Sequence, residues 1–533
     1  MLSGQPIIIL RENVERTQGF EAQRSNIMAA KAIAAAVRTT LGPRGMDKML
    51  VSSTGDVVIT NDGATILHEM SVQHPAAKLA VEVAEAQDDE VGDGTTTATV
   101  LLGSLMEEAE DLLAQDVHPT TIAQGYRLGM EKALEIVDEL AIPVGADDRE
   151  NLLKLAGTAM TGKSIEGVKD KVSAIVVDAV RQVATKTEEG IYVVDEDDIK
   201  IKKQGGDSMD DVSLIRGVVI DKKRVFEQMP EKVTNAKVAL LAQPLEITKT
   251  QVKSKIKITS SDQVRAFSEQ ERESLRKLAD QIVAAGANVV LCQKGIADAV
   301  QYYLAKHGVY ALEDVKEEDM KFAARALGGN IVNKPEELTE EALGHAEMVE
   351  EVPDADLTII SGCENPKSVT ILLRGTSQLL LDELERGVYD GTRVIQDAIE
   401  DGKFVTGGGS VETELQLRIR DYAATIGGRV QLAIEAFANA FEVIPRTLAE
   451  NSGFDTIDKV VAMRKAHAEG ARHAGLDVYT GEIVDMLDAG VVEPLRVKVQ
   501  AIKSATETAV LLIRVDDMMI TRSEKRPGEA GAE

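Results

Sequence analysis

The chain of 533 residues contains no tryptophan, and aromatic residues make up only 3% of it. Alanine, valine, isoleucine and leucine must therefore fill its cores, because hydrophobic residues still account for 44% of the sequence. At about 150 residues per domain, a chain of this length predicts three to four domains with several packed cores.

Cysteine is nearly absent too, with only Cys292 and Cys363 present. Two cysteines without a CxxC motif exclude a disulfide scaffold and a cysteine metal site, so we predict reduced, structural thiols. No run approaches about 18 apolar residues, so no membrane span is expected. Residues 1–10 lack the basic and then apolar pattern of a signal peptide. We therefore expect a soluble, cytoplasmic protein.

Basic residues are outnumbered, with 60 Lys and Arg against 89 Asp and Glu and a net charge of -29. The acidic residues are spread along the chain rather than gathered in a tail. Such a surface repels nucleic acid and anionic membranes, so we expect neither as a partner. A solvated, self-repelling surface explains this composition, and adaptation to a salty cytosol is an open alternative.

The first third of the chain has helical texture. Apolar residues at helical spacing predict helices at residues 21–38, 76–90, 95–114 and 120–141. The first of these should stop at Gly42-Pro43, and the last before Pro143. A short strand is predicted at residues 56–60, followed by a turn at Asn61-Asp62-Gly63.

The middle of the chain alternates strand-like and helical runs. The strand-like runs are residues 191–194, 216–220, 237–241, 288–292, 357–360 and 369–373. From about residue 404 the helical, alanine-rich texture returns and persists to about residue 518. This order predicts an α/β module inserted into a helical domain. The polar tail, residues 521–533, is predicted to be disordered.

A glycine-rich motif, Gly92-Asp93-Gly94-Thr95-Thr96-Thr97, precedes one predicted helix. Its glycines would let the backbone approach an anion closely. The free N–H groups and the dipole of a helix N-terminus attract phosphate. Asp93 could hold Mg²⁺, which takes one or two carboxylates and keeps several waters. The alternative is an ordinary helix N-terminus capped by Thr or Asp side chains.

Two further glycine clusters lie elsewhere. The segment Thr40-Leu41-Gly42-Pro43-Arg44-Gly45 follows a predicted helix, and a helix C-cap would explain it equally well. It lacks Walker A spacing, and neither loop has the dinucleotide-binding pattern, so a P-loop or Rossmann protein is disfavoured. Gly407-Gly408-Gly409 predicts either a ligand pressed against the backbone or a hinge.

Three single residues carry charges that phosphate chemistry could use. Asp62 and Asp390 could each orient a water for attack on a γ-phosphate. Lys163, in Thr161-Gly162-Lys163, could form an ion pair with a phosphate group. Taken alone, each of the two acids is more often a turn or surface residue, and Lys163 could be a solvated lysine.

Short segments in a fixed order connect these loops to a known family. They are TTLGPRGMDKML (39–50), TNDGATIL (60–67), HPAAKL (74–79), EVGDGTTTATV (90–100), TGKS (161–164), NVVLCQKGI (288–296), TILLRG (370–375), TGGGSVETEL (406–415), IPRTLAENSGFD (444–455) and VVEPLRVKVQAIKSATETAVLLIRVDD (491–517). Together they resemble the group II chaperonins, the archaeal thermosome and its eukaryotic cytosolic relatives. The resemblance covers nearly the whole chain, and archaeal members are the most similar.

The resemblance implies a role for each loop. Asp390 resembles the acid that polarises the attacking water, and Asp62 looks like its partner near the γ-phosphate. Asp93 looks like the Mg²⁺ ligand, Lys163 resembles a γ-phosphate sensor, and Glu493 stands where the family contacts the ribose. The remaining nucleotide contacts implied are Thr40, Leu41, Gly42, Pro43, Gly45, Gly92, Gly94, Thr95, Thr96, Thr97, Gly408 and Gly409.

The resemblance also implies a multidomain α+β chaperonin fold. A mainly helical equatorial ATPase domain would comprise residues 1–145 and 404–520. An α/β intermediate domain would comprise residues 146–214 and 367–403. An α/β apical domain, residues 215–366, would carry a helical lid protrusion at about 246–278. In that protrusion Val264 and Phe267 are apolar residues at helical spacing.

The function implied is ATP-dependent protein folding in a double ring with a built-in lid. ATP and Mg²⁺ would be the cofactors, and a K⁺ ion is left open. The partners would be unfolded proteins and copies of the chain or related subunits, in rings of eight or nine. Two alternatives stay open: a small-molecule phosphotransferase that uses the same loops, and an assembly subunit that no longer hydrolyses ATP.

The sequence departs from the family pattern at three places. Gly375 is followed by Thr376, where the family usually has a second glycine. The acid-bearing helix reads Tyr389-Asp390-Gly391-Thr392, and Gly391 should weaken it by roughly 1 kcal/mol relative to alanine. The tail also lacks the Gly/Met-rich repeats of some members.

Overall fold

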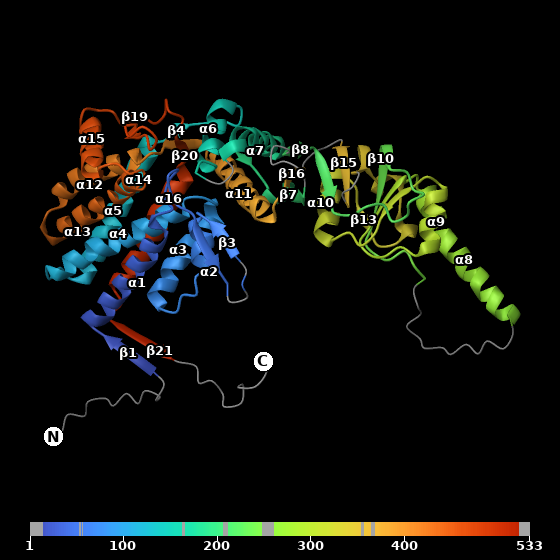
Figure 1. The fold of residues 1–533 in the computed structure, drawn as a ribbon, viewed down its shortest axis with the longest axis horizontal. Coiled ribbons are helices and arrows are strands. Elements are labelled where there is room, and N and C mark those ends of the chain that lie inside the picture. The colour runs from blue at the N-terminus through green and yellow to red at the C-terminus, as the bar shows by residue number, and fades with distance from the viewer. Residues whose placement is uncertain are drawn as a thin grey trace, which may run out of the picture. The chain divides into compact units, whose positions relative to one another are not determined.

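The computed structural model describes residues 14–52, 55, 57–162, 166–205, 212–247, 261–352, 356–363 and 368–521. The chain forms two compact units (Figure 1). The first unit combines residues 1–169 with residues 393–533, and the second unit is formed by residues 170–392. The second unit is thus inserted into the first. The finer division into equatorial, intermediate and apical domains stays a prediction.

The first unit is mainly helical, and its early helices confirm the predictions made from apolar spacing. Its helices are α1 (Phe20–Arg38), α2 (Gly63–Glu69), α3 (Pro75–Val91), α4 (Thr95–Ala114), α5 (Pro119–Leu140), α6 (Arg149–Ala159), α12 (Ser410–Ile426), α13 (Gly428–Ala440), α14 (Val443–Asn451), α15 (Thr456–Ala468) and α16 (Leu495–Ile513). Segments from both ends of the chain share one hydrophobic core, in which α4 packs against α1, α13 and α16.

Small residues let these helices approach closely, which explains how the core forms with so few aromatics. A Cβ atom on Gly103 of α4 would lie 2.3 Å from the Cβ atom of Ala34 on α1. Three aromatic side chains belong to the buried part of this core. Tyr126, Phe437 and Phe441 are fully buried and stack by their edges, with neighbouring ring centroids 5.2–5.6 Å apart.

Short strands complete the first unit. They are β1 (Val14–Gln18), β2 (Lys48–Val51), β3 (Val57–Thr60), β4 (Ile142–Pro143), β17 (Lys403–Thr406), β18 (Ala474–Leu476), β19 (Ile483–Asp485), β20 (Val492–Pro494) and β21 (Asp517–Thr521). They pair as β1–β21, β2–β3, β18–β19 and β20–β17–β4. The pairing of β1 with β21 joins the two ends of the described chain (Figure 1).

Two local predictions in this unit are wrong. The predicted turn at Asn61-Asp62-Gly63 is instead the start of α2, with Asp62 as its N-cap and Gly63 as its first residue. The helical texture expected to about residue 518 ends earlier, since α16 stops at Ile513 and β21 follows. Thr521, assigned to the disordered tail, is the last residue of that strand, and residues 522–533 lie outside the described residues.

The second unit contains a larger sheet with the strand order β12-β11-β10-β14-β15-β9, and β13 also pairs with β10. These strands are β9 (Gly217–Ile220), β10 (Lys232–Leu241), β11 (Val289–Cys292), β12 (Tyr310–Leu312), β13 (Ile331–Val332), β14 (Gly344–Val352) and β15 (Leu357–Cys363). Alternate residues of β10 and β11 enter two separate cores, so both faces of the sheet are covered.

Helices cover the two faces of this sheet. Met320 and Phe322 of α10 (Glu317–Leu327) pack on one face. α8 (Ser261–Ala284) and α9 (Asp298–Lys306) pack on the other face, through residues such as Leu275 and Leu304. The first turns of α8 extend beyond the sheet (Figure 1), and Phe267 there is 45% exposed. In the predicted lid, residues 248–260 and the side chain of Val264 lie outside what the structure describes.

A smaller sheet completes the second unit, with the order β7-β16-β8. Its strands are β7 (Ile199–Gly205), β8 (Ser213–Ile215) and β16 (Val369–Gly375), beside the hairpin of β5 (Thr185–Lys186) and β6 (Tyr192–Val193). Two helices, α7 (Lys169–Val183) and α11 (Gln378–Asp401), run from one unit into the other. Short 3₁₀ turns lie at Glu166–Val168, Glu196–Asp198, Pro335–Glu337 and Glu340–Ala342.

Both cysteines are free and buried, as predicted. Burial raises the pKa of each thiol to about 11, so both stay protonated at neutral pH. Among the helices that the structure describes, none is long and apolar enough to cross a membrane.

Candidate functional site

The N-terminus of α4 is built from two glycines with left-handed backbone. Gly92, at φ 70°, ends α3, and Gly94, at φ 78°, is the N-cap of α4. In addition, neither position has room for a side chain. A Cβ atom on Gly92 would lie 2.8 Å from side-chain carbons of Arg393, and one on Gly94 would lie 2.8 Å from a methyl group of Val497.

No side chain caps this helix, so the predicted alternative of an ordinary Thr or Asp cap is wrong here. The carboxylate of Asp93 accepts a hydrogen bond from the backbone N–H of Gly94 at 2.7 Å, at the cap itself. Thr96 and Thr97 are half-buried in the first turn. The N-terminal amides of α4 and their dipole therefore remain able to bind an anion.

Asp62 lies against this helix start. Its Oδ1 accepts a hydrogen bond from the hydroxyl of Thr95 at 3.1 Å, and its Oδ2 accepts one from the backbone N–H of Thr65 at 2.8 Å. A Cβ atom on Gly63 would lie 2.7 Å from the Thr96 hydroxyl oxygen. The N-termini of α2 and α4 therefore meet, and Asp62 acts as a helix cap within the folded chain.

The loop of Thr40 to Gly45 is held in a tight turn. The hydroxyl of Thr40 donates to the carbonyl of Val37 at 2.8 Å, and Gly42 has φ 80°. A Cβ atom on Gly45 would lie 2.2 Å from the Thr40 carbonyl oxygen. The alternative of a glycine C-cap is wrong, because Thr39 caps α1.

Two neighbouring segments contact this loop. A Cβ atom on Gly162 would lie 2.8 Å from the Cα atom of Pro43, which shows how closely the backbones approach. The side-chain amide of Asn61 donates to the Gly162 carbonyl at 2.7 Å. The segment that ends at Gly162 therefore lies beside residues 42–43 and the start of α2. Lys163 itself lies outside the described residues.

Each glycine of the third cluster, Gly407 to Gly409, packs closely against a different side chain of the first unit. Cβ atoms on Gly407, Gly408 and Gly409 would lie 3.1, 2.5 and 3.0 Å from side-chain atoms of Val491, Met486 and Pro445. Gly409 is the N-cap of α12, again without a side-chain hydrogen bond. Close packing thus accounts for these glycines, and the boundary between the two units lies at residues 392–393 rather than here.

A buried ion cluster, formed by Glu412, Lys498 and Glu493, adjoins the glycine loops. The Lys498 ammonium lies 2.5 Å from Glu412 Oε1 and 2.9 Å from Glu493 Oε1. Burial lowers the pKa of Lys498, but the two carboxylates outweigh it, so the pKa is raised. Burial raises the pKa of Glu493 to about 7; Lys498 opposes that rise, and the carboxylates of Glu412 and Asp93 add to it.

Gln87 connects this cluster to the Asp93 loop. Its side-chain amide donates to the backbone carbonyls of Asp93 at 2.8 Å and of Val497 at 3.2 Å. The structure thus brings Asp62, Asp93, the threonines of α4 and Glu493 into one region of the first unit. Sequence reasoning missed Gln87, Glu412 and Lys498, because nothing local distinguishes a buried charged side chain from a solvated one.

Asp390 lies in α11, in the part of that helix that belongs to the second unit. The helix continues through Gly391 and Thr392, and the Thr392 hydroxyl donates to the carbonyl of Val388 at 2.8 Å. The departure from the family pattern therefore does not break the helix. The catalytic role assigned to Asp390 stays a prediction.

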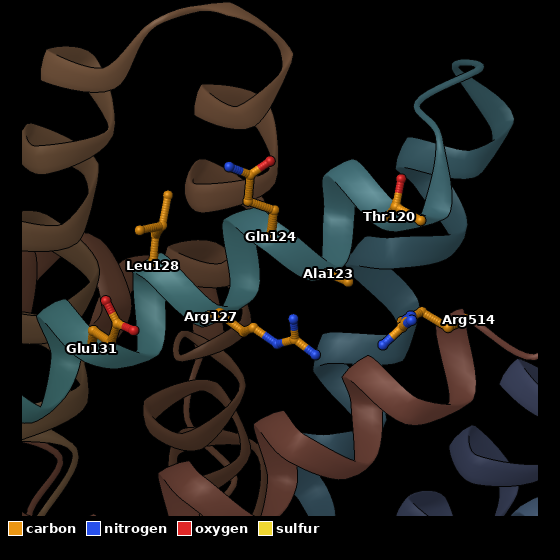
Figure 2. Close-up of a pocket in the computed structure, with 7 residues that line it drawn as sticks. All are labelled: Thr120, Ala123, Gln124, Arg127, Leu128, Glu131 and Arg514. Atoms are coloured by element: carbon orange, nitrogen blue, oxygen red, sulfur yellow. The ribbon is translucent and has the colours of Figure 1, made fainter.

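A surface pocket of about 370 Å³ lies elsewhere in the first unit (Figure 2). Its lining residues are Thr120, Ala123, Gln124, Arg127, Leu128 and Glu131 of α5, with Arg514 after α16. None of the predicted nucleotide contacts lines it. The guanidinium groups of Arg127 and Arg514 point toward the same space (Figure 2). In the part of the chain that the structure describes, no group of three or more His, Cys, Asp or Glu residues could hold a metal.

Comparison with known proteins agrees with this architecture. The chain is 53% identical to thermosome subunit alpha of Archaeoglobus fulgidus, over 100% of this chain and 98% of that protein. It is also 53% identical to a thermosome subunit of Methanopyrus kandleri, over 97% of this chain and 95% of that protein.

A solved structure is similar as well: the open-state monomer of a group II chaperonin from Methanococcoides burtonii. Its TM-score is 0.61 at 45% identity, over 80% of this chain and all of that one. The model of the TCP-1/cpn60 chaperonin family matches residues 33–523. With relatives this similar along its whole length, the chain belongs to the TCP-1/cpn60 chaperonin family.

Proposed function

We propose that this chain is a subunit of a group II chaperonin of the thermosome type, which hydrolyses ATP to fold other proteins in the cytoplasm. The observation that carries the proposal is the N-terminus of α4. It follows two left-handed glycines, has no side-chain cap, and lies beside two carboxylates, Asp62 and Asp93. The thermosome relatives support the same function.

ATP binds with its phosphates at the start of α4. The amides of residues 95–97 and the threonine hydroxyls donate to phosphate oxygens, because no side chain caps this helix end and the Gly94 amide already donates to Asp93. The backbone of the Thr40 to Gly45 loop and of Gly408 and Gly409 closes the site. Asp93 fits Mg²⁺, which takes one or two carboxylates together with phosphate oxygens and water. When bound, Mg²⁺ supplies positive charge that offsets the phosphates. Whether a K⁺ ion binds in addition is left open.

Hydrolysis needs a water aligned with the γ-phosphorus. Asp390 accepts a hydrogen bond from that water and draws off its proton as the bond to the β–γ bridging oxygen breaks, which leaves ADP and phosphate. Asp62 assists near the γ-phosphate, and Lys163 senses its charge. These three roles rest on the resemblance to the family. Turnover then drives movement of the apical domain and closure of its lid.

The partners are copies of this chain or related subunits, in stacked rings of eight or nine, and unfolded polypeptides. Exposed apolar side chains of the second unit suit such polypeptides, because apolar surface binds without sequence specificity. Phe267 of α8 and Tyr302 of α9, 45% and 51% exposed, are of this kind. Residues 215–366 form the apical domain in this proposal, with the lid at about 246–278.

The first test replaces Asp390 by alanine. We expect the variant to bind ATP as tightly as the parent but to release no phosphate above background, because the group that orients water is gone. Its native mass should match that of the parent, about 0.9 MDa for two rings of eight 57.4-kDa chains. If the variant still hydrolyses ATP, the role assigned to Asp390 is wrong. If the parent stays monomeric and hydrolyses no ATP in the presence of Mg-ATP, the folding-cage proposal is wrong.

A further inference from the structure

The buried ion cluster of Glu412, Lys498 and Glu493 joins three separate elements of the first unit. Glu412 lies in the first turn of α12, Glu493 lies in β20, and Lys498 lies in the first turn of α16. Only 7% of the Lys498 side chain and 4% of the Glu412 side chain are exposed. An isolated buried charge is costly, so the placement of each of these groups depends on the other two.

The cluster is not needed merely to hold the fold. A buried ion pair contributes little net stability, and apolar side chains of similar volume often replace one without loss. Here one carboxylate oxygen, Glu412 Oε2, is buried and makes no hydrogen bond. An unsatisfied buried acceptor is destabilising. Stability alone therefore does not explain the cluster.

Glu493 is the member that a ligand can reach, since 19% of its side chain is exposed. Its backbone pairs with Val405 of β17, directly before the glycine cluster. Its Oε1 atom lies 3.3 Å from the position that a Cβ atom on Gly407 would occupy. Lys498 contacts the same oxygen and so fixes the direction of the carboxyl group.

The charges of the cluster select the part of a nucleotide that can lie there. Two carboxylates share one ammonium group in the cluster. Their excess negative charge disfavours a phosphate there, whereas the uncapped N-terminus of α4 attracts one. A nucleotide offers a carboxylate two kinds of neutral donor, the adenine amino group and the vicinal ribose hydroxyls. The resemblance to the family, which contacts the ribose at the position of Glu493, favours the hydroxyls, and carboxylates recognise them in other nucleotide-binding folds.

We propose that Lys498, anchored by Glu412, is a positioning residue that holds the Glu493 carboxyl group against the ribose hydroxyls and thereby selects ribonucleotides over 2′-deoxyribonucleotides. This inference rests on the proposed function, since it places ATP in the same site. It adds two residues that touch no nucleotide themselves. Their effect is on discrimination between sugars rather than on the chemical step.

The test compares ATP with 2′-deoxy-ATP as substrates of the full-length assembly. We expect the parent to have a KM for 2′-deoxy-ATP about 10- to 100-fold higher than for ATP, the range of one hydrogen bond to a charged group. Lys498→Met should bring that ratio close to one by raising the KM for ATP, with little change in kcat. Glu412→Gln, which keeps Lys498 and loosens its anchor, should give an intermediate ratio.

A matched control lies on the same helix. Glu414 of α12 pairs with the buried His467 at 2.8 Å, away from Glu493. Glu414→Gln therefore loses a buried pair of the same kind, and its ratio of KM values should equal that of the parent. If Lys498→Met does not assemble, Glu412→Gln carries the test.

Two failures can be told apart. If the parent discriminates between the sugars and both Lys498→Met and Glu412→Gln discriminate equally well, the positioning role is wrong while the nucleotide site stands. The role is also wrong if Glu414→Gln loses discrimination to the same extent as they do. If the parent binds neither nucleotide, the proposed function fails, and this inference fails with it.

Discussion

Each unit of the molecule contains a buried cluster of opposite charges, and the two clusters differ in their balance. In the second unit Asp319 of α10 contacts Lys200 and Lys202 of β7, and Lys202 also lies 2.6 Å from Asp221. In the first unit two carboxylates share Lys498, and Glu412 Oε2 has no hydrogen-bond partner. One cluster has balanced charges, and the other has an excess of negative charge.

The surroundings of the two clusters explain this difference. The Asp319 cluster ties a helix to the edge of a small sheet, and a balanced cluster is sufficient for that. The Lys498 cluster lies beside glycine loops and an uncapped helix N-terminus, where we propose that a nucleotide completes the arrangement. Buried charge therefore indicates function here only where its pairing is incomplete and a backbone cradle adjoins it.

The largest effect is expected at Asp93, in the loop beside the incomplete cluster. Asp93→Ala should lower ATP turnover at least about 100-fold, because the proposed Mg²⁺ ligand is lost. Phosphate release by the purified assembly measures this. The control is Asp89→Ala, which removes an exposed carboxylate from α3 four residues earlier and should leave turnover unchanged. Equal losses in the two variants would point to net charge rather than to a magnesium site.

The second effect concerns the balanced cluster around Asp319 in the second unit. Asp319→Asn leaves Lys200 without this carboxylate and Lys202 with Asp221 alone, so it should destabilise the second unit by about 2 kcal/mol. Turnover of ATP per folded assembly should stay within twofold of the parent. Thermal unfolding and phosphate release measure the two quantities. Glu318→Gln, at the exposed neighbouring position, is the control for stability. A large loss of ATP turnover without a loss of stability would show that the Asp319 cluster also serves turnover, which would contradict the difference drawn between the two clusters.

The smallest effect concerns a third buried carboxylate, Asp397 of α11, which lies 2.8 Å from Arg496. Burial raises its pKa from 3.8 to about 7, although Arg496 opposes the rise. The folded state therefore binds this proton more tightly than the unfolded state. The resulting stability is complete below about pH 4 and is lost as pH rises through 7.

Asp397→Asn cannot titrate, so it isolates this group. Between pH 5 and pH 8 the parent should lose stability relative to the variant, by an amount on the order of 2 kcal/mol. The difference between their thermal midpoints, followed across that range, measures the loss. A difference that stays constant with pH, or one that grows in favour of the parent, would show that Arg496 keeps the carboxylate ionised throughout.

Local signals were sufficient to predict part of this molecule. The helix at residues 95–114 and its glycine-rich start were predictable, because backbone freedom and helix periodicity are properties of neighbouring residues. Asp62 was assigned to a turn although it is the N-cap of α2, since a turn and an N-cap favour the same residue types. The roles of Lys163, Asp390 and Glu493 depend on resemblance rather than on local pattern.

Contacts between distant residues could not be predicted in this way. Strand β21 pairs with β1, although about 500 residues separate them, and neither strand has a sequence pattern that indicates its partner. Lys498 and Glu412 are separated by 86 residues, and only the folded core makes them neighbours. The burial of a lysine is a tertiary property, which is why this cluster emerged only from the structure.

The most direct measurement is a structure of the assembly with Mg²⁺ and a non-hydrolysable ATP analogue. The phosphates should lie at the N-terminus of α4, within hydrogen-bond distance of the amides of residues 95–97. The Asp93 carboxylate should contact the metal, and Glu493 should contact the ribose. Phosphates bound elsewhere, such as between Arg127 and Arg514 in the pocket of Figure 2, with the start of α4 unchanged, would contradict the account.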